Sequence, residues 1–135
     1  MSRGSDEQVA ANLRAMTIEG VRVLALEAPE QIRYFPGFVS VPDELIRGIS
    51  DPLGLIEASG IDGVLRPAEA NDLRALVSRC QCLFADVPHL QETPPDDLLA
   101  EPGWQEVRAF ARVLLHRHRW EGPPSGDFSS FVPSR

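Results

Sequence analysis

The sequence predicts an α+β domain in which a small, mainly antiparallel sheet, from about residue 21 to 65, is packed by an N-terminal helix and two long C-terminal helices. Residues 21–28 are apolar on both alternating faces apart from Arg22 and Glu27, as a covered strand would be. The stretches that follow Pro67 and Gly103 carry apolar residues at helical spacing. A length of 135 residues, 43% of them apolar, suffices for one core without metal or disulfides.

A helix is expected first, from about Ser5 to Gly20. Ser5 and Gln8 form the pattern of a capping box, and the apolar residues that follow recur at helical spacing. Residues 21–28 come next and are the best candidate for a central strand, because apolar side chains on both faces indicate cover on both sides.

The rest of the expected sheet is interleaved with two short helices. Residues 31–35 and 38–41 alternate in polarity around a Pro-Gly pair, which predicts two strands joined by a turn. Residues 42–48 and 52–60 each open with proline, continue with periodic apolar residues and end at glycine, as short helices do. Residues 61–65 are expected to add a small strand.

The C-terminal half is expected to be helical. Residues 67–87 form the clearest helix and residues 103–120 the last one, each with an apolar face for the core. The acidic, proline-rich stretch between them is interpreted as a surface connection. We therefore expect one domain, residues 1–121, followed by a Gly/Pro/Ser-rich tail, residues 122–135, that carries apolar anchors.

The chain contains 13 arginines and no lysine. This excludes, for the chain by itself, P-loop and protein-kinase phosphate binding, Schiff-base chemistry and Ser-x-x-Lys acylation. A lysine-free composition is typical of a GC-rich bacterial genome, and escape from lysine-directed modification is the alternative explanation.

A formal net charge of −7 repels nucleic-acid backbones and anionic membrane surfaces. Residues 1–12 lack the apolar core of a signal peptide, and the longest aliphatic run, residues 23–26, is far too short to span a bilayer. Cys80 and Cys82 are too close in sequence for an unstrained disulfide, in keeping with a reducing compartment. We expect a cytoplasmic protein that binds neither nucleic acid nor membrane.

No metal or other cofactor is expected. Cys80 with Cys82, and His116 with His118, are pairs of residues two apart, which point to different sides of a helix, so neither pair chelates one ion. In a strand the two histidines would share a face. Cys80 falls on the apolar face of its helix, where we expect it to be buried.

The last helix carries a basic stripe, formed by Arg108, Arg112, His116 and Arg119. One interpretation is an anion or carboxylate site, because arginine binds these groups bidentately. The other, which we favour, is that cations near a helix C-terminus complement its dipole and pair with the domain's own acids. His118, on the apolar face, is interpreted as a packing residue rather than a catalytic base, because nothing nearby in sequence orients it.

Aromatic residues mark two further candidate binding surfaces. Tyr34, Phe35 and Phe38 cluster around the expected turn, where they form a ligand wall or partner hot spot, or else part of the core. Phe128 and Phe131 place two rings three residues apart in the tail, as expected for a segment that docks into a groove of the same chain, a second copy or a partner.

Together these features predict a non-catalytic acidic domain, an adaptor, chaperone or inhibitor, that binds another, more basic protein as a homodimer or in a heteromeric complex. Its size and acidity are similar to those of small secretion chaperones and bacterial immunity proteins, a likeness of composition alone. The alternative is a small enzyme or small-molecule-binding domain, with a pocket between the sheet and the last helix. The polar groups of that pocket would be Tyr34, Arg112 and His116 or His118.

Overall fold

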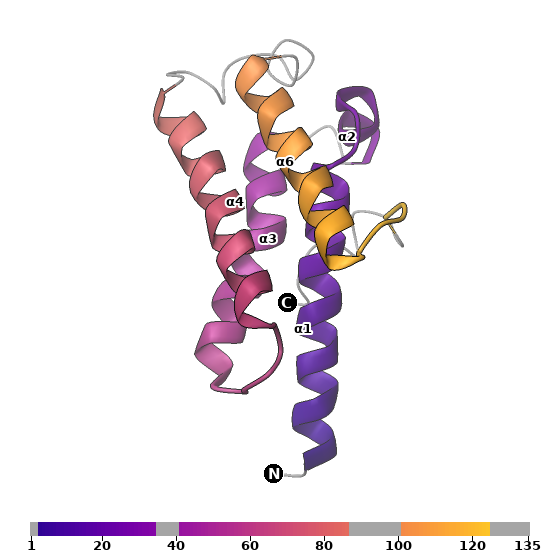
Figure 1. Ribbon diagram of the computed structural model, residues 1–135, viewed down its shortest axis with the longest axis vertical. Helices are drawn as coiled ribbons and strands as arrows, with labels where there is room; N and C mark the ends of the chain where they lie inside the picture. Colours follow the sequence, from indigo (N-terminus) through magenta and orange to yellow (C-terminus); the bar gives the residue numbers. More distant parts are fainter. Residues whose placement is uncertain (1–2, 35–40, 87–100, 125–135) are drawn as a thin grey trace.

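The structure, a computed structural model, describes residues 3–34, 41–86 and 101–124. Within these ranges the chain is helical and contains no strand, so the predicted α+β fold with an antiparallel sheet is wrong (Figure 1). The helices are α1 (Arg3–Leu24), α2 (Ala28–Tyr34), α3 (Val41–Ser59), α4 (Pro67–Asp86) and α6 (Pro102–His118).

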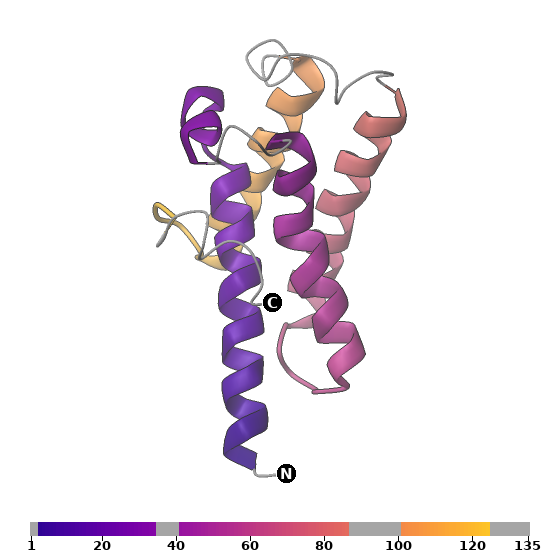
Figure 2. The same ribbon diagram turned by 180° about the vertical axis from the view of Figure 1, so that it is seen from behind.

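Four of these helices, α1, α3, α4 and α6, form an up-and-down bundle. Chain direction alternates from each to the next, and the order of packing is α1, α3, α4, α6 and back to α1 (Figures 1 and 2). The short helix α2 lies beside the end of α1, at the outer edge of the bundle. At the opposite end, the first turns of α1 project beyond the loop that joins α3 to α4.

The core runs along the bundle axis and draws on all four long helices. Its fully buried large side chains are Leu24, Leu45, Ile49, Leu73, Leu76, Trp104 and Leu114. Within the long helices, buried residues recur every three or four positions, which places them on one face of the helix. No helix in the described ranges is long and apolar enough to cross a membrane.

Residues 21–28 are the clearest correction to the sequence-based prediction. Residues 21–24 form the last turn of α1 and are followed by the bend that leads into α2, instead of forming a central strand. Val21, Val23 and Leu24 are all fully buried, and Arg22 between them is partly buried, because this end of α1 packs against neighbouring helices on most of its circumference. A helical turn with buried apolar residues on most sides carries little 3.6-residue polar signal, so its sequence matches that of a covered strand.

The other predicted strands and short helices are also replaced. Residues 31–34 belong to α2, and the two short helices expected at 42–48 and 52–60 are one helix, α3. Residues 61–65 form a turn rather than a strand, with positive φ at Gly60 and Gly63. The predicted turn and second strand around residues 35–40 lie outside the described residues.

The two long C-terminal helices are confirmed. Helix α4 buries Leu73, Leu76 and Cys80, the predicted core face. Helix α6 ends at His118, and Arg119 adopts the left-handed conformation (φ 60°) at its C-cap. Of the predicted tail, residues 122–124 are described and the remainder lies outside the described residues.

Candidate functional site

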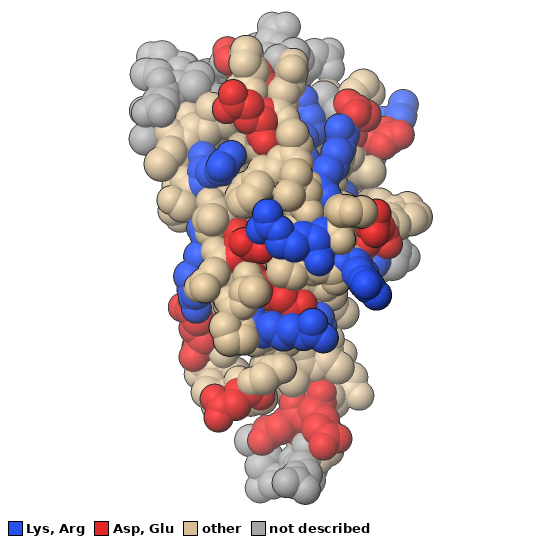
Figure 3. All heavy atoms as spheres, in the orientation of Figure 1, with Lys and Arg blue, Asp and Glu red and all other residues tan. Residues whose placement is uncertain are grey.

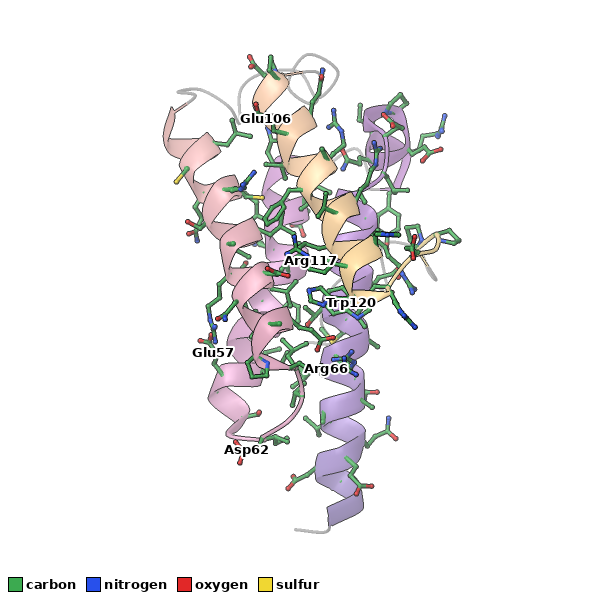
Figure 4. All side chains as sticks on the ribbon, viewed as in Figure 1. Glu57, Asp62, Arg66, Glu106, Arg117 and Trp120 are labelled. Atoms are coloured by element: carbon green, nitrogen blue, oxygen red, sulfur yellow. The ribbon has the colours of Figure 1, made fainter. Side chains whose placement is uncertain are left out.

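Trp120 lies among charged side chains that come from α1, α4 and α6. It follows α6, is 4% exposed, and stacks against His118 with ring centroids 4.8 Å apart. The Arg14 guanidinium of α1 lies 5.9 Å from the indole centroid, and Arg22 Nε donates a 2.8 Å hydrogen bond to the Trp120 carbonyl. Figure 4 shows Trp120 between the labelled side chains of Arg117 and Arg66.

Arg14 and Glu69 form a two-pronged ion pair between α1 and α4. The two guanidinium Nη atoms lie 2.7 and 2.9 Å from the two carboxylate oxygens. Glu69 is 2% exposed and also accepts a 2.8 Å hydrogen bond from the backbone N–H of Arg66, the residue before α4. The position is the third of the helix, where a glutamate reaches back to the cap. The hydrogen bonds from Arg14 hold the pKa of the Glu69 carboxyl below its usual value, although burial alone would raise it.

His118 is oriented by an acid that lies 46 residues earlier in the chain. Its Nε2 lies 2.7 Å from Oδ2 of Asp72 on α4, and Arg117 Nη1 donates to the same oxygen at 2.9 Å. Burial alone would raise the pKa of the Asp72 carboxyl, but the hydrogen bonds from His118 and Arg117 outweigh it and lower the pKa. The His118 side chain is 10% exposed, as expected for a packing residue.

A carboxylate-oriented imidazole is also the arrangement of a general base. In the described part of the chain, however, His118 has no serine, threonine or cysteine within hydrogen-bond distance to activate. The contact between His118 and Asp72 connects the C-terminal turn of α6 to the first turns of α4.

Two arginines of the predicted stripe, Arg108 and Arg112, lie near the α1–α2 junction. Arg112 donates from Nε to the Ala25 carbonyl at 3.0 Å and from Nη2 to Glu27 at 2.6 Å. Arg108 is buried, and burial lowers the pKa of its guanidinium, an effect that the negative charge of Glu27 opposes. The Arg112 guanidinium therefore connects α6 to the C-terminal end of α1.

The remaining predicted residues are scattered over the molecule. Tyr34 is half-buried with its hydroxyl 3.5 Å from Glu19, His116 is exposed with Nδ1 3.3 Å from Glu121, and Arg119 is exposed. Four candidates, Phe35, Phe38, Phe128 and Phe131, lie outside the described residues.

Described residues line two cavities that open to the surface, one between α4 and α6 and one at the turn between α3 and α4. The α4–α6 cavity, of about 410 Å³, lies between the end of α4 and the start of α6 and is lined by Leu83, Val107, Arg79, Glu106 and Cys82, with Ser78 and Gly103. The turn cavity, of about 270 Å³, lies where α3 joins α4. Leu53, Ile56, Ile61, Val64 and Leu65 supply its apolar lining, with Glu57, Asp62 and Arg74 as its charged residues.

Neither cavity is lined by Tyr34, Arg112, His116 or His118, so the polar groups expected of a small enzyme are not brought together in either one. No group of three or more His, Cys, Asp or Glu side chains in the described ranges is placed to hold a metal ion.

No protein-family model matches the chain, and neither do the curated proteins or the solved structures.

Arg14, Glu69 and Asp72 were not among the predicted site residues. Glu69 and Asp72 lie three residues apart on α4, and the Arg-Pro-x-Glu spacing at the start of that helix does indicate a capping glutamate. Their partners on α1 and α6 are about 50 residues away in sequence, so no local pattern indicates them.

The end of the bundle that holds the turn cavity is acidic. Asp6 and Glu7 lie in the first turns of α1, Glu57 at the end of α3 and Asp62 in the turn, and Figures 3 and 4 show carboxylates gathered at this end. We call these four residues the acidic end. Arginines are spread over the face above it, formed by α1, α4 and α6.

Proposed function

We propose that the chain is a non-catalytic interaction domain that binds a basic protein partner through the acidic end. The observation that carries this proposal is the turn cavity, an open cavity with an apolar lining that has two of the four carboxylates, Glu57 and Asp62, at its surface. Interfaces are dominated by a few apolar or aromatic anchors seated in such pockets and surrounded by polar groups.

The acidic end has little internal compensation of its charge. Asp6, Glu7 and Asp62 make no ion pair with the rest of the described chain, and Glu57 meets Arg74 at 3.5 Å, where both side chains are more than half exposed. Exposed pairs of this kind contribute at most about 1 kcal/mol. A basic partner relieves the repulsion among these carboxylates and is steered toward them during association.

Exposed aliphatic side chains lie on the same end of the molecule. Leu55 on the last turns of α3 is 46% exposed and Val9 on the projecting part of α1 is 42% exposed. Together with the turn cavity they supply apolar contact area at the same end of the molecule as the four carboxylates. This combination fits a basic protein segment that carries one large apolar anchor.

A symmetric homodimer through the acidic end is disfavoured, because a twofold interface brings the same carboxylates of both copies together. We infer a heteromeric complex instead. A cytoplasmic setting accords with the free thiols of Cys80 and Cys82, which a reducing compartment maintains.

The experiment compares two variants of equal charge as affinity baits in the native host. The acidic-end variant is Glu7→Gln/Leu55→Gln/Asp62→Asn. The control, Glu30→Gln/Glu106→Gln/Val113→Gln, also removes two exposed carboxylates and one exposed aliphatic side chain, from α2 and α6. A partner retained by the wild type is then purified and titrated against each bait at about 150 mM salt.

We expect a partner with a positively charged surface, whose Kd rises at least about tenfold, or 1.4 kcal/mol, with the acidic-end variant and stays within about twofold with the control. An acidic partner, or equal weakening by the two variants, would contradict the proposal.

A further inference from the structure

We propose that the surface around Trp120 is a second binding site, which recognises a carboxylate-rich protein segment. Its five arginines come from three parts of the chain, α1, the residue before α4, and the end of α6, and are Arg14, Arg22, Arg66, Arg117 and Arg119. We call these residues, with Trp120, the Trp120 surface. It uses none of the residues proposed to bind the basic partner.

The contacts around Trp120 hold these arginines together. Arg14 and Arg22 touch the ring and the carbonyl of Trp120, and Arg117 and Arg119 lie beside it in the chain. Arg66 joins them through its backbone bond to Glu69, the partner of Arg14. The carboxylates within the same group are Glu69, Asp72 and Glu121, so five guanidinium charges face three acids. A chain of net charge −7 thus presents a locally positive face, which Figure 3 shows as arginine side chains over α1, α4 and α6.

Several guanidinium donors on this surface are unused. Arg66 and Arg119 are exposed, and their side chains form no hydrogen bond or ion pair with the described residues. Arg117 is half exposed and gives one of its Nη atoms to Asp72. An arginine carries five N–H donors in a fixed fork, so these three side chains offer paired donors to solvent in the geometry that carboxylates accept.

The surface is held in place before any ligand arrives. Trp120 is buried against His118, the Arg14–Glu69 pair crosses from α1 to α4, and Arg119 is fixed in the left-handed conformation at the end of α6. A charged surface on a rigid base loses less conformational entropy on binding than one on a loop. The buried contacts form a rigid support, and the exposed arginines are the groups that meet the ligand.

Carboxylates of a protein segment fit this surface better than a nucleic-acid backbone does. A polyanion extends beyond the patch and meets a chain of net charge −7, including Glu121 and Asp72 within the patch itself. A short acidic segment needs two or three arginine forks and no more. Binding of a nucleic-acid strand is the alternative that the experiment tests.

The test uses two labelled probes of equal charge, a short glutamate- and aspartate-rich peptide and a single-stranded oligonucleotide, titrated by fluorescence anisotropy at low salt. The site variant is Arg66→Gln/Arg119→Gln. The control, Arg33→Gln/Arg79→Gln, removes the same charge from exposed arginines of α2 and α4 that lie outside the Trp120 surface and outside the turn cavity. Thermal melts establish that both variants are folded.

We expect the peptide to bind the wild type with a Kd that rises at least about tenfold in the site variant and stays within about twofold in the control. In a ¹⁵N NMR titration the indole N–H of Trp120 should shift, while that of Trp104, at the other end of α6, should not. Equal losses in the two variants, tighter binding of the oligonucleotide, an unmoved Trp120 signal, or no peptide binding at millimolar concentration would each overturn the proposal. None of these results bears on the acidic end, whose carboxylates are intact in all three proteins.

Discussion

The buried polar side chains of this protein act mainly as links between helices. Glu69 connects α4 to α1 through Arg14, and His118 connects α6 to α4 through Asp72. Gln31 of α2 is fully buried and donates from Nε2 to two carbonyls at the C-terminal end of α1. Each link satisfies groups that would be costly to bury alone, so its removal should be felt in stability.

The Arg14–Glu69 pair should make stability depend on acid pH. Because the folded pKa of Glu69 lies below its unfolded value of about 4.3, the contribution is present above that pH and is lost as pH falls through the folded pKa. We expect Glu69→Gln to lower the melting temperature at pH 7 and to flatten its decline below about pH 5. Asp72, whose pKa is also lowered, preserves part of that decline.

Thermal melts between pH 3 and 7 check this, with Glu30→Gln on the exposed face of α2 as the control. An acid decline equally steep in wild type and Glu69→Gln would show that the pair contributes nothing to it.

Gln31 should be needed to close the end of α1. Its Nε2 lies 3.2 Å from the Val23 carbonyl, which also accepts from the Leu26 N–H, and 2.9 Å from the Leu24 carbonyl, which has no backbone donor in the described chain. Gln31→Leu keeps the volume but leaves the Leu24 carbonyl unsatisfied, so we expect a loss of about 1–3 kcal/mol in unfolding free energy. Denaturant titration measures it against Gln81→Leu, an exposed position on α4, where a change below about 0.5 kcal/mol is expected. A similar small change at Gln31 would show that water satisfies the Leu24 carbonyl.

Helices α1 and α3 owe their close packing to glycine and proline. A Cβ on Gly20 would collide with the carbonyl oxygen of Gly48, so the two backbones meet directly. Pro52 has no N–H to offer the Gly48 carbonyl, its usual helical acceptor. The Gly48 carbonyl therefore lacks that helical hydrogen bond where it faces Gly20.

Gly20→Ala should consequently separate α1 from α3. The clash is with backbone, which cannot rotate away, and we expect a loss of about 1–3 kcal/mol or more in unfolding free energy. Gly54→Ala on α3 is the matched control, because nothing lies within 4 Å of the added Cβ. There the exchange should stabilise the helix by about 0.5–1 kcal/mol. Opposite signs for the two variants are the expected result of chemical denaturation, and a neutral Gly20→Ala would mean that the helices shift to accommodate it.

The sequence predicts helices correctly where one face is polar and the other apolar, as in α4 and α6. It fails where that contrast is missing. Val21, Val23 and Leu24 are all buried although they point to different sides of the helix, so their pattern does not distinguish a helix from a covered strand. In α3, Pro52 and two glycines indicate a break by local rules, but packing against α1 continues the helix through them.

The candidate sites were predictable in part for the same reason. The basic character of α6 is evident from residues that are neighbours in the sequence, and the acidic composition predicts a positively charged partner. The pairing of His118 with Asp72, and of Arg14 with Glu69, depends on which helices lie side by side in the bundle. A sequence read as containing a sheet could not supply that arrangement.

One continuous apolar core lies beneath a surface of mixed charge. Carboxylates gather at the end where α3 joins α4 and also at the opposite end, where Glu106 lies, and arginines spread over the face formed by α1, α4 and α6. The core beneath joins all four long helices, with Trp104 near one end of α6 and Trp120 beyond the other. Such a core has no boundary along which one helix could open alone, so unfolding should be a single cooperative transition.

Cys80 offers a direct measure of that cooperativity. It is 1% exposed, and burial raises the pKa of its thiol to about 12, whereas Cys82 on the next turn of the same helix is exposed. In a Cys82→Ser variant, where Cys80 is the one remaining thiol, labelling by a thiol reagent at neutral pH requires the bundle to open. We expect the free energy of opening from the labelling rate to equal the global unfolding free energy from urea titration. Adding Leu76→Ala, which empties a core position on the same face of α4, should lower both values together by about 2–5 kcal/mol. Fast labelling of Cys80 with an unchanged urea midpoint would show instead that α4 opens locally.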